Sequence, residues 1–561
     1  REINFLNFYP YSGKKIEELE GVHVTPKGVG LVISPWNFPV AIPTGGIAAA
    51  LSAGNTVILK PASDAVLCAK MVCECFWNAG ISKNTLQFLP SSGTLAGDEL
   101  ITDKDVDFVI FTGGEQSAYN ILKKRPGIHI SAETGGKDAT IVTSMSDRDQ
   151  ALKNVMASAF NNSGQKCSAT SLLVLEDELY DDEEFKNLLI DAASSLETGS
   201  VWDFKNKIAA LSSKPSGNLK KALTYLDEGE EWLIKPSYAD NENPYMLKPS
   251  IRWGTSRGDF CHMNELFGPV LSVMRAEDLN SAIDIVNSTG YGLTSGLESL
   301  DEREQDIWRE SLKAGNLYIN RGTTGAIVIR QPFGGMGKSA IGSGKKAGGF
   351  NYVTQFMNIT ADTVNKKESF SHPYIDKLDS LTCDGEFENE IRAAVDIAKG
   401  FLYWIDKEFD KEHDYANIRG ESNIIRYLPV KSVLLRCEEG DKLEEILASM
   451  CAVKTVNALL HLSLPKSITS NEFAWLINNS KSILGENDLV RLENEDELIK
   501  SITKVQRVRF LNPIHVTQKI YDAISAKAKH ISSEPFVTHG RVEMLHYYTE
   551  QSVTNLYHRY G

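Results

Sequence analysis

The sequence lacks several features that define other classes of protein. It has no run of 18 apolar residues and no opening pattern of charged then apolar residues, so neither a membrane span nor a secretory leader is predicted. Its basic runs are short and its formal net charge is -15. Because nucleic acid is a polyanion, this charge disfavours nucleic-acid binding by the chain. Membrane contact by a part outside this chain stays open.

Cysteine is scarce as well. The 8 cysteines in 561 residues show no disulfide-framework spacing, which favours a reducing cytoplasm as the location. Cys73 and Cys75 lie in an apolar segment, residues 65–76, that is predicted to be helical. Side chains two residues apart on a helix point about 200° away from each other. No second cluster has ligand spacing, so no metal site is predicted.

The bulk composition is that of a multidomain enzyme, with 42% hydrophobic and 24% charged residues. Apolar runs at residues 28–34, 56–59 and 108–111 alternate with expected helices at 45–53 and 65–79, which indicates βαβ units on a parallel sheet. Further strands are expected near 171–175, 271–274, 432–436 and 455–459. The predicted class is therefore α/β throughout.

One cysteine has a setting that suits catalysis. Cys167 lies among small and polar residues, 161–168, and follows Glu133 by 34 positions. A thiolate can add to an aldehyde and form a thiohemiacetal, which passes hydride to a nicotinamide and becomes a thioester. A glutamate suits the base that activates water for thioester cleavage. Asn37, held between two prolines, can offer an amide to the oxyanion.

Seven motifs then carry a resemblance. The chain resembles the aldehyde dehydrogenase superfamily through SPWNFP at 34–39, ILKPAS at 58–63, FTGG at 111–114, ETGGK at 133–137, GQKCS at 164–168, NELFGPV at 264–270 and QPFGG at 331–335. The resemblance implies a Rossmann-type NAD-binding domain and an α/β catalytic domain. It also implies Cys167 as nucleophile, Glu133 as deacylation base, and Asn37 with the Cys167 N–H as oxyanion hole.

The same resemblance implies a set of cofactor contacts. Lys60 and Glu265 would hold the riboses, Phe267 would lie near the nicotinamide, and the turn at Thr112, Gly113 and Gly114 would present a helix N-terminus to the pyrophosphate. The remaining implied NAD-binding residues are Pro35, Trp36, Ser63 and Gly93. The family commonly has Ser at position 114 and an acid at position 63. Because Ser63 repels a 2'-phosphate less than an acid does, NAD is expected and NADP stays open.

A second group of residues narrows the substrate. Thr323–Thr324–Gly325–Ala326 followed by QPFGG, with Cys167–Ser168, resembles the L-glutamate γ-semialdehyde (pyrroline-5-carboxylate) dehydrogenases. In those enzymes such residues bind the α-carboxylate and amine. A glycine here lets backbone N–H groups approach a carboxylate. The implied substrate-binding residues are Lys166, Ser168, Gly325, Ala326 and Phe333.

The tail is similar to the C-terminal domain of long proline utilization A (PutA) proteins. The matching segments are GESN at 420–423, RYLP at 426–429, GRVEMLH at 540–546, EQSV at 550–553 and HRYG at 558–561. PutA proteins carry a flavin-dependent proline dehydrogenase barrel before the aldehyde dehydrogenase module. That barrel, with its FAD, is absent from this chain. We therefore expect a fragment of a longer protein, with an N-terminally incomplete cofactor domain and a proline dehydrogenase domain preceding it.

The expected organisation has five parts. Residues 1–135 form the NAD-binding domain, 136–335 the catalytic domain, 336–361 a return segment and oligomerisation region, 362–380 a linker, and 381–561 a further α/β domain. The predicted function is NAD-dependent oxidation of L-glutamate γ-semialdehyde to glutamate by a cytoplasmic homo-oligomer. Two alternatives stay open: a dehydrogenase of another carboxylate-bearing aldehyde, and a noncatalytic assembly or lid module, which would suit residues 381–561.

Overall fold

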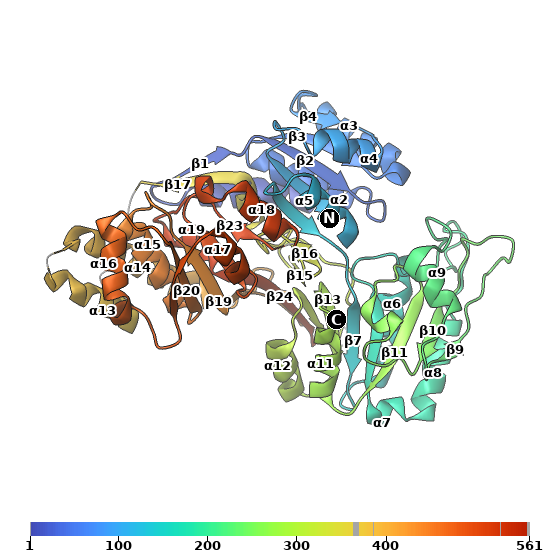
Figure 1. Cartoon of the computed structure of the whole chain (residues 1–561). Coiled ribbons are helices and arrows are strands. Elements are labelled where there is room, and N and C mark those ends of the chain that lie inside the picture. Colours follow the sequence, from blue (N-terminus) through green and yellow to red (C-terminus); the bar gives the residue numbers. More distant parts are fainter. Residues whose placement is uncertain (1, 363–369, 385, 528, 558–561) are drawn as a thin grey trace.

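The computed structural model describes residues 2–362, 370–384, 386–527 and 529–557. Within these ranges three large sheets and two small ones are covered by helices, and Figure 1 shows three units around them. The α/β class predicted from the sequence is confirmed. Residues 363–369 of the predicted linker and the tail motif at 558–561 lie outside the described ranges.

The first unit is built on a six-stranded sheet with the order β16-β6-β5-β2-β3-β4. β2, β3 and β5 are apolar and almost wholly buried, as expected of parallel strands covered on both faces. The strands are β2 (Val29–Ser34), β3 (Thr56–Pro61), β4 (Leu86–Phe88), β5 (Phe108–Thr112), β6 (His129–Glu133) and β16 (Ala340–Ile341). The helices are α1 (Glu2–Glu17), α2 (Ala41–Ser52), α3 (Val66–Asn78), α4 (Gly93–Leu95) and α5 (Glu115–Lys124).

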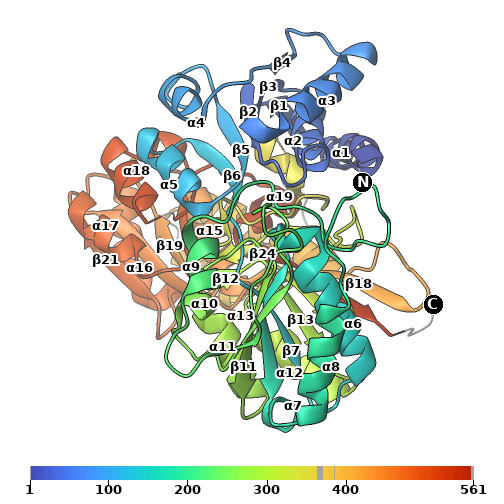
Figure 2. The same cartoon turned by 90° about the vertical axis from the view of Figure 1, so that its right-hand side faces the viewer.

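The second unit contains a nine-stranded sheet with the order β18-β24-β14-β13-β7-β8-β11-β10-β9. Its strands are β7 (Asp138–Val142), β8 (Thr170–Glu176), β9 (Glu231–Ile234), β10 (Ser250–Trp253), β11 (Val270–Ala276), β13 (Thr294–Glu298), β14 (Asn316–Ile319), β18 (Glu421–Pro429) and β24 (Tyr548–Leu556). Its helices are α6 (Arg148–Phe160), α7 (Asp177–Tyr180), α8 (Glu183–Ser194), α9 (Gly217–Thr224), α10 (Phe260–Met263), α11 (Leu279–Ser288) and α12 (Glu302–Ser311). In Figure 2 these helices surround the lower unit, and α1–α5 belong to the upper one.

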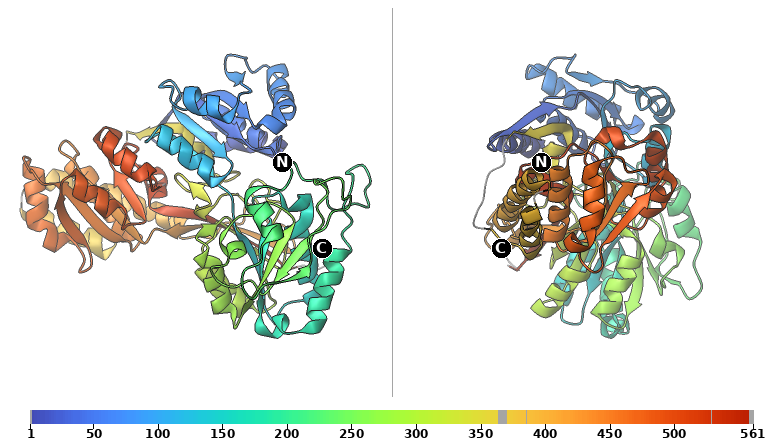
Figure 3. Two further views of the ribbon diagram at one scale, coloured as in Figure 1. Left: turned by 45° about the vertical axis from the view of Figure 1, so that its right-hand side comes forward. Right: turned by 60° about the vertical axis from the view of Figure 1, so that its left-hand side comes forward.

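Two strands of this sheet come from the tail of the chain. β24 pairs in parallel with β14, and β18 pairs antiparallel with β24 along nine residues. We call β18 and β24 the tail strands. They reach from the C-terminal unit into the second unit (Figure 3). The expectation that residues 381–561 form one separate domain is therefore corrected for these strands. Local alternation in the sequence predicts that a strand exists, but it does not say which sheet the strand joins.

The third unit has a five-stranded sheet with the order β21-β20-β19-β22-β23. Its strands are β19 (Ser432–Arg436), β20 (Leu459–Pro465), β21 (Leu489–Glu493), β22 (Arg507–Phe510) and β23 (Ile531–Ser532). Its helices are α13 (Pro373–Ser380), α14 (Glu388–Trp404), α15 (Leu443–Thr455), α16 (Asn471–Ile483), α17 (Glu495–Ile502), α18 (Gln518–Ser525) and α19 (Gly540–Glu543). A large apolar core joins α13, α14 and α15 to this sheet.

Two boundaries differ from those expected. The predicted linker, 362–380, includes α13, whose Tyr374, Ile375 and Leu378 are buried in the core of the third unit. The strand expected at 455–459 begins only at Leu459, because α15 runs to Thr455 and Asn457 turns the chain with a φ of 57°. The mixed composition of residues 362–380 does not reveal that α13 packs against the third unit. The sequence near residue 457 likewise does not reveal the turn between α15 and β20.

Residues 336–361 connect the units. β15 (Met336–Gly337) pairs with β12 (Tyr291–Gly292), β16 pairs with β6, and β17 (Met357–Ala361) pairs with β1 (Val22–Pro26). The segment thus returns from the second unit to the first. None of the described helices combines the length and apolar character needed to cross a bilayer.

Candidate active site

A cavity of about 160 Å³ lies where the first two units meet, and we call it the Cys167 cavity. Seven of the predicted site residues line it: Thr112, Glu133, Cys167, Ser168, Gly325, Ala326 and Phe333. Apolar side chains from α1 and α2, such as Phe5 and Ile42, form another part of its wall. The candidate nucleophile, the candidate base and four of the five candidate anchor residues therefore share one small cavity.

The loop that carries Cys167 has an unusual backbone. Asn162, Ser163 and Gly164 all have positive φ, at 59°, 56° and 66°. A side chain at Gly164 would collide with the carbonyl oxygen of Gly268, so only glycine fits there. Non-glycine residues in this region store strain, which persists when the surroundings fix the backbone. The Ser163 hydroxyl, which donates to the Ala209 carbonyl at 2.6 Å, is one such constraint.

Asn37 lies beside this loop. Its Nδ2 donates to the carbonyl oxygen of Gln165 at 3.4 Å, two residues before Cys167. The side-chain amide is thus close to the cysteine loop, although its donor atom faces a backbone carbonyl. Its expected role in an oxyanion hole stays a prediction.

The thiol of Cys167 is surrounded by groups that oppose ionisation. Burial raises its pKa well above the ordinary value, and the carboxylates of Asp138, Glu265 and Glu133 raise it further. A reactive thiol commonly has a lowered pKa, whereas the surroundings of Cys167 in this structure raise it. Attack by sulfur therefore requires a group that removes the proton.

Glu133 stands at the carboxyl end of β6, where its backbone pairs with Thr112 of β5. Its Oε2 accepts from the Gly335 N–H at 2.9 Å. Burial raises the pKa of the carboxyl to about 7, while the Lys346 ammonium and this hydrogen bond act in the opposite direction. A pKa near the working pH is the property required of a general base. The neighbouring residue Gly334 must also lack a side chain, because a Cβ there would lie 2.9 Å from Glu133 Oε1.

Lys346 is a site residue that sequence reasoning missed. Burial lowers its pKa to about 8, and Glu133 and Glu550 counteract that shift. Its Nζ donates to the Gly334 carbonyl and to Asn316 Oδ1, the latter at 3.3 Å. Its backbone N–H donates to Glu550 Oε2 of β24 at 2.8 Å. No motif pointed to Lys346, which follows Lys345 in a glycine-rich loop, because lysines in such loops are usually solvated.

The tail of the chain also holds the loop of the predicted substrate anchor. Gly325 has a φ of 98°, and Gln331 Oε1 accepts from the Ile327 N–H at 3.2 Å. Glu421 of β18 accepts from Arg330 at 2.9 Å and from Gln331 at 3.0 Å. The GESN motif thus lies against this loop. Lys166, also predicted as an anchor, does not line the Cys167 cavity.

The predicted cofactor residues surround the carboxyl ends of β2, β3 and β5. Gly114 caps α5, and the Gly113 N–H donates to the Glu133 carbonyl at 3.1 Å. The rings of Trp36 and Phe267 meet edge to face, with centroids 5.7 Å apart, and Phe267 has a φ of 56°. This arrangement joins the turn into α5 directly to the strand that ends in Glu133.

Other members of the cofactor set differ in burial. Burial lowers the pKa of Lys60 on β3, and Glu265 Oε1 accepts from the Gly136 N–H at 3.0 Å. Pro35 is half-buried, whereas Ser63 and Gly93 are exposed. The first turn of α5, which is expected to face the pyrophosphate, also carries a carboxylate, that of Glu115. This carboxylate accepts hydrogen bonds from the hydroxyls of Tyr119 and Tyr291.

A sequence model described as the Aldehyde dehydrogenase family matches residues 8–361, more than half of the chain. The chain belongs to the aldehyde dehydrogenase family. Its curated relatives include the 1-pyrroline-5-carboxylate dehydrogenase of Bacillus cytotoxicus, which is 34% identical over 376 residues. The match covers 63% of this chain and 72% of that relative. The enzyme of that name from Bacillus subtilis is 35% identical over 375 residues, with the same coverage.

Solved structures of aldehyde dehydrogenases extend the likeness. Proline Utilization A from Corynebacterium freiburgense superposes with a TM-score of 0.85 at 34% identity over 100% of this chain, which spans 53% of that protein. The 1-pyrroline-5-carboxylate dehydrogenase from Thermus with bound NAD superposes with a TM-score of 0.59 at 32% identity, covering 64% of this chain and 73% of that one. The first of these likenesses thus extends over the third unit as well.

Proposed function

We propose that the protein oxidises L-glutamate γ-semialdehyde, the open form of pyrroline-5-carboxylate, to L-glutamate with NAD. The observation that carries this proposal is the joint placement of Cys167, Glu133 and the Gly325 loop around one cavity. The relatives named 1-pyrroline-5-carboxylate dehydrogenase support the choice of substrate. A carboxylate-bearing aldehyde also suits a cavity lined by Gly325, because a glycine leaves the backbone open to the approach of a carboxylate.

The first chemical step requires proton removal from Cys167. Its raised pKa keeps the thiol protonated, and the Glu133 carboxyl, with a pKa of about 7, is ionised in part at neutral pH. Glu133 accepts the thiol proton as sulfur bonds to the aldehyde carbon, and it then passes that proton to solvent. The oxyanion that forms is stabilised by the Cys167 N–H, with the Asn37 amide available beside the loop.

The second step leaves an acyl group on sulfur. NAD, held by Lys60, Glu265 and the turn into α5, would supply the acceptor for the hydride. Glu133 then removes a proton from water as the water adds to the thioester, and the carbon–sulfur bond breaks. The released thiolate takes that proton from Glu133, and the product leaves as a carboxylate whose own proton is lost to solvent. The aldehyde thus loses one hydride and gains one oxygen from water.

The residues present fit NAD. The turn from β5 into the ten-residue helix α5 offers backbone N–H groups at a helix N-terminus. Lys60 lies near the carboxyl end of β3, and Glu265 accepts from the Gly136 N–H just after β6. The Trp36 and Phe267 rings, which meet edge to face, add apolar surface. The relative from Thermus is described with bound NAD. The preference over NADP belongs to the proposal, as do cytoplasmic location and homo-oligomeric assembly.

The likeness to PutA supports a proposal about the third unit and about a domain outside this chain. A solved PutA relative is described as bifunctional. We infer that the full protein carries a flavin-dependent proline dehydrogenase domain before this chain, which would supply the semialdehyde. The lid or assembly role considered for residues 381–561 is compatible with catalysis, because Glu421 and Glu550 contact the loops around the Cys167 cavity.

The test is NADH formation with glutamate semialdehyde, acetaldehyde and succinate semialdehyde. The proposal predicts the largest kcat/KM for glutamate semialdehyde and loss of at least about 10³-fold in Cys167→Ala. Cys73→Ala, which changes a buried cysteine on α3 outside the Cys167 cavity, is the matched control. Equal rates with acetaldehyde would contradict the substrate assignment, and an active Cys167→Ala variant would contradict the nucleophile.

A further inference from the structure

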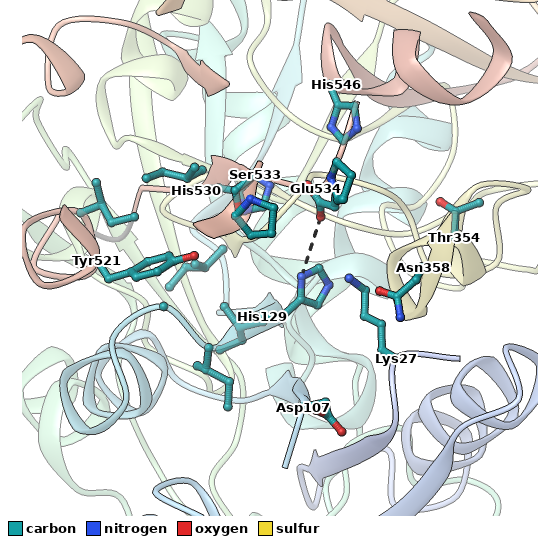
Figure 4. Close-up of a pocket in the computed structure, with 18 of the residues that line it drawn as sticks. Lys27, Asp107, His129, Thr354, Asn358, Tyr521, His530, Ser533, Glu534 and His546 are labelled. Atoms are coloured by element: carbon teal, nitrogen blue, oxygen red, sulfur yellow. Dashed lines mark ion pairs between the residues drawn. The ribbon is translucent and has the colours of Figure 1, made fainter. Parts of the chain in front are cut away.

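A second and larger cavity, of about 540 Å³, lies between the first and third units. Its walls come from α5, β6 and β17 and from α18, β23 and the segment after β23 (Figure 4). Among the described residues none lines both this cavity and the Cys167 cavity, although β6 contributes His129 here and Glu133 there. We call it the basic cavity, after its charged lining residues Lys27, Asp107, Arg125, Lys345, Lys529 and Glu534.

These lining charges have a positive balance, with four cations against two carboxylates. Arg125 and Lys529 donate to backbone carbonyls, and Asp107 accepts from the Val29 N–H at 2.7 Å. Lys345 donates to the Thr354 hydroxyl, and burial lowers its pKa to about 8, so its ammonium persists at pH 7. Figure 4 shows Lys27 directed toward the centre of the cavity, where Glu534 stands opposite.

Three histidines complete the polar part of the wall. Burial lowers the pKa of His129 to about 3 and that of His530 to about 4, and it lowers that of His546 as well. Burial thus favours the neutral form of each imidazole at physiological pH. Burial also opposes ionisation of Glu534, but the neighbouring His546, Lys27, His129 and His530 lower its pKa well below the ordinary value. At neutral pH the cavity thus contains one central carboxylate among ammonium groups and neutral imidazoles.

Several polar atoms of this cluster are buried and unsatisfied. Within the described ranges, His129 Nε2, His530 Nε2 and Glu534 Oε2 have no hydrogen-bond partner. The approach of His129 Nδ1 to Glu534 Oε1, at 3.9 Å, is too long for a hydrogen bond. Buried polar groups of native proteins are nearly always paired, so these atoms require partners that the described chain does not supply, either water or a ligand.

A metal ion does not account for this cluster. Among the described residues only Asp227, Glu230 and Asp259 bring three such ligand atoms within 4.8 Å of one another, and they lie in the second unit. The histidines and Glu534 of the basic cavity are more dispersed. Its excess of cations also opposes a further positive charge.

Much of the remaining wall is apolar. It is formed by Leu122, Ile128, Ile130, Ile341, Met357, Ile359, Ile524, Ile531, Val537, Val542 and Leu545, with the ring of Tyr521 at one side. Cavities of this size hold molecules of several tens of atoms at most. We propose that the basic cavity binds a small organic anion, a carboxylate or phosphate attached to an apolar body. The Lys27 and Lys345 ammonium groups contact its charged end, and the aliphatic wall contacts its body.

The test uses three probes that share one apolar body: 3-phenylpropanoate, phenyl phosphate and the neutral 3-phenylpropanol. Isothermal titration calorimetry with the protein saturated with NAD should show that at least one anion binds ten or more times as tightly as the alcohol. The more tightly bound anion identifies the charged group as carboxylate or phosphate. The double variant Lys27→Met/Lys345→Met should remove this advantage, whereas Glu534→Gln should tighten anion binding severalfold.

Lys70→Met is the matched control, because Lys70 is an exposed lysine of α3 that pairs with Glu74. It should bind each probe as the unaltered protein does. The opposite signs expected for the lysine and glutamate variants separate a charge effect from a folding defect. The proposal is overturned if neither anion binds, if the alcohol binds as tightly as the anions, or if the double variant retains the difference.

Discussion

Lys346 controls the ionisation of Glu133 in this structure, and Lys346→Met tests that relation. The ammonium counteracts the effect of burial on the Glu133 pKa, which is about 7. An opposite charge nearby changes a carboxyl pKa by about 1–3 units. Removal of the ammonium should therefore raise the pKa of Glu133 by at least about one unit, to about 8 or higher.

The size of the kinetic effect follows from this shift. A base with a pKa of about 7 is about half ionised at pH 7, and one with a pKa of about 8 is about one-tenth ionised. Because the ionised carboxylate is the active form, activity is present above the pKa and lost as the pH falls through it. Lys346→Met should lose about fivefold in kcat at pH 7 and recover as the pH approaches about 9.

The assay is the pH profile of steady-state NADH formation, with acyl-enzyme accumulation measured by rapid quench. Lys346→Arg keeps the charge and should keep the profile. Lys186→Met is a matched control, since Lys186 is a half-buried lysine that lies over the Trp253 ring and pairs with Glu231. A Lys346→Met profile with an unshifted midpoint would refute the proposed action of the lysine on the base.

Two further variants test the loop and the tail. Gly334→Ala places a Cβ 2.9 Å from Glu133 Oε1 and should displace the carboxylate, lowering kcat by about 10²-fold while NAD binding persists. Gly13→Ala on α1, where the added Cβ meets the flexible end of Met357 at 3.3 Å, is the control for added side-chain volume, and equal activity in both would contradict the packing argument. Glu543→Ala leaves Arg509 buried without the carboxylate that it meets at 3.0 Å, and should lower the free energy of unfolding of the third unit by about 3–5 kcal/mol in urea titrations. Glu18→Ala removes only a surface pair and should not move the midpoint, so a Glu543→Ala midpoint equally unmoved would show that the buried pair adds no stability.

Local signals explain how much of this fold is predictable from sequence. The strand expected at 432–436 has those bounds in β19, because its apolar residues and flanking turns are contiguous. The sheet chosen by β24 is not predictable in this way, since its partner β14 lies more than 200 residues earlier. The motif order identified the family, because several short motifs retain their spacing along the chain.

The candidate active site likewise contains residues that the sequence indicates and residues that only the fold reveals. Cys167 and Glu133 stand in motifs whose residue types indicate their chemistry, and the structure brings both to one cavity. Lys346 and Asn316 carry no such signal, because their importance arises from burial beside Glu133 and Gly334. The pKa of the Cys167 thiol was not predictable from the sequence for a related reason. It depends on Asp138 and Glu265, whose distance from the thiol is set only by folding.

The tail strands have a consequence for biosynthesis. Glu421 lies almost a hundred residues beyond the substrate loop that it contacts, and Glu550 lies about two hundred residues beyond Lys346. A ribosome adds residues from the N-terminus, so both glutamates emerge after the cysteine and its base are already in the nascent chain. The active centre acquires these supports only after the segments that they hold have been synthesised. Chains truncated before Glu421 would therefore contain the nucleophile and the base without these contacts.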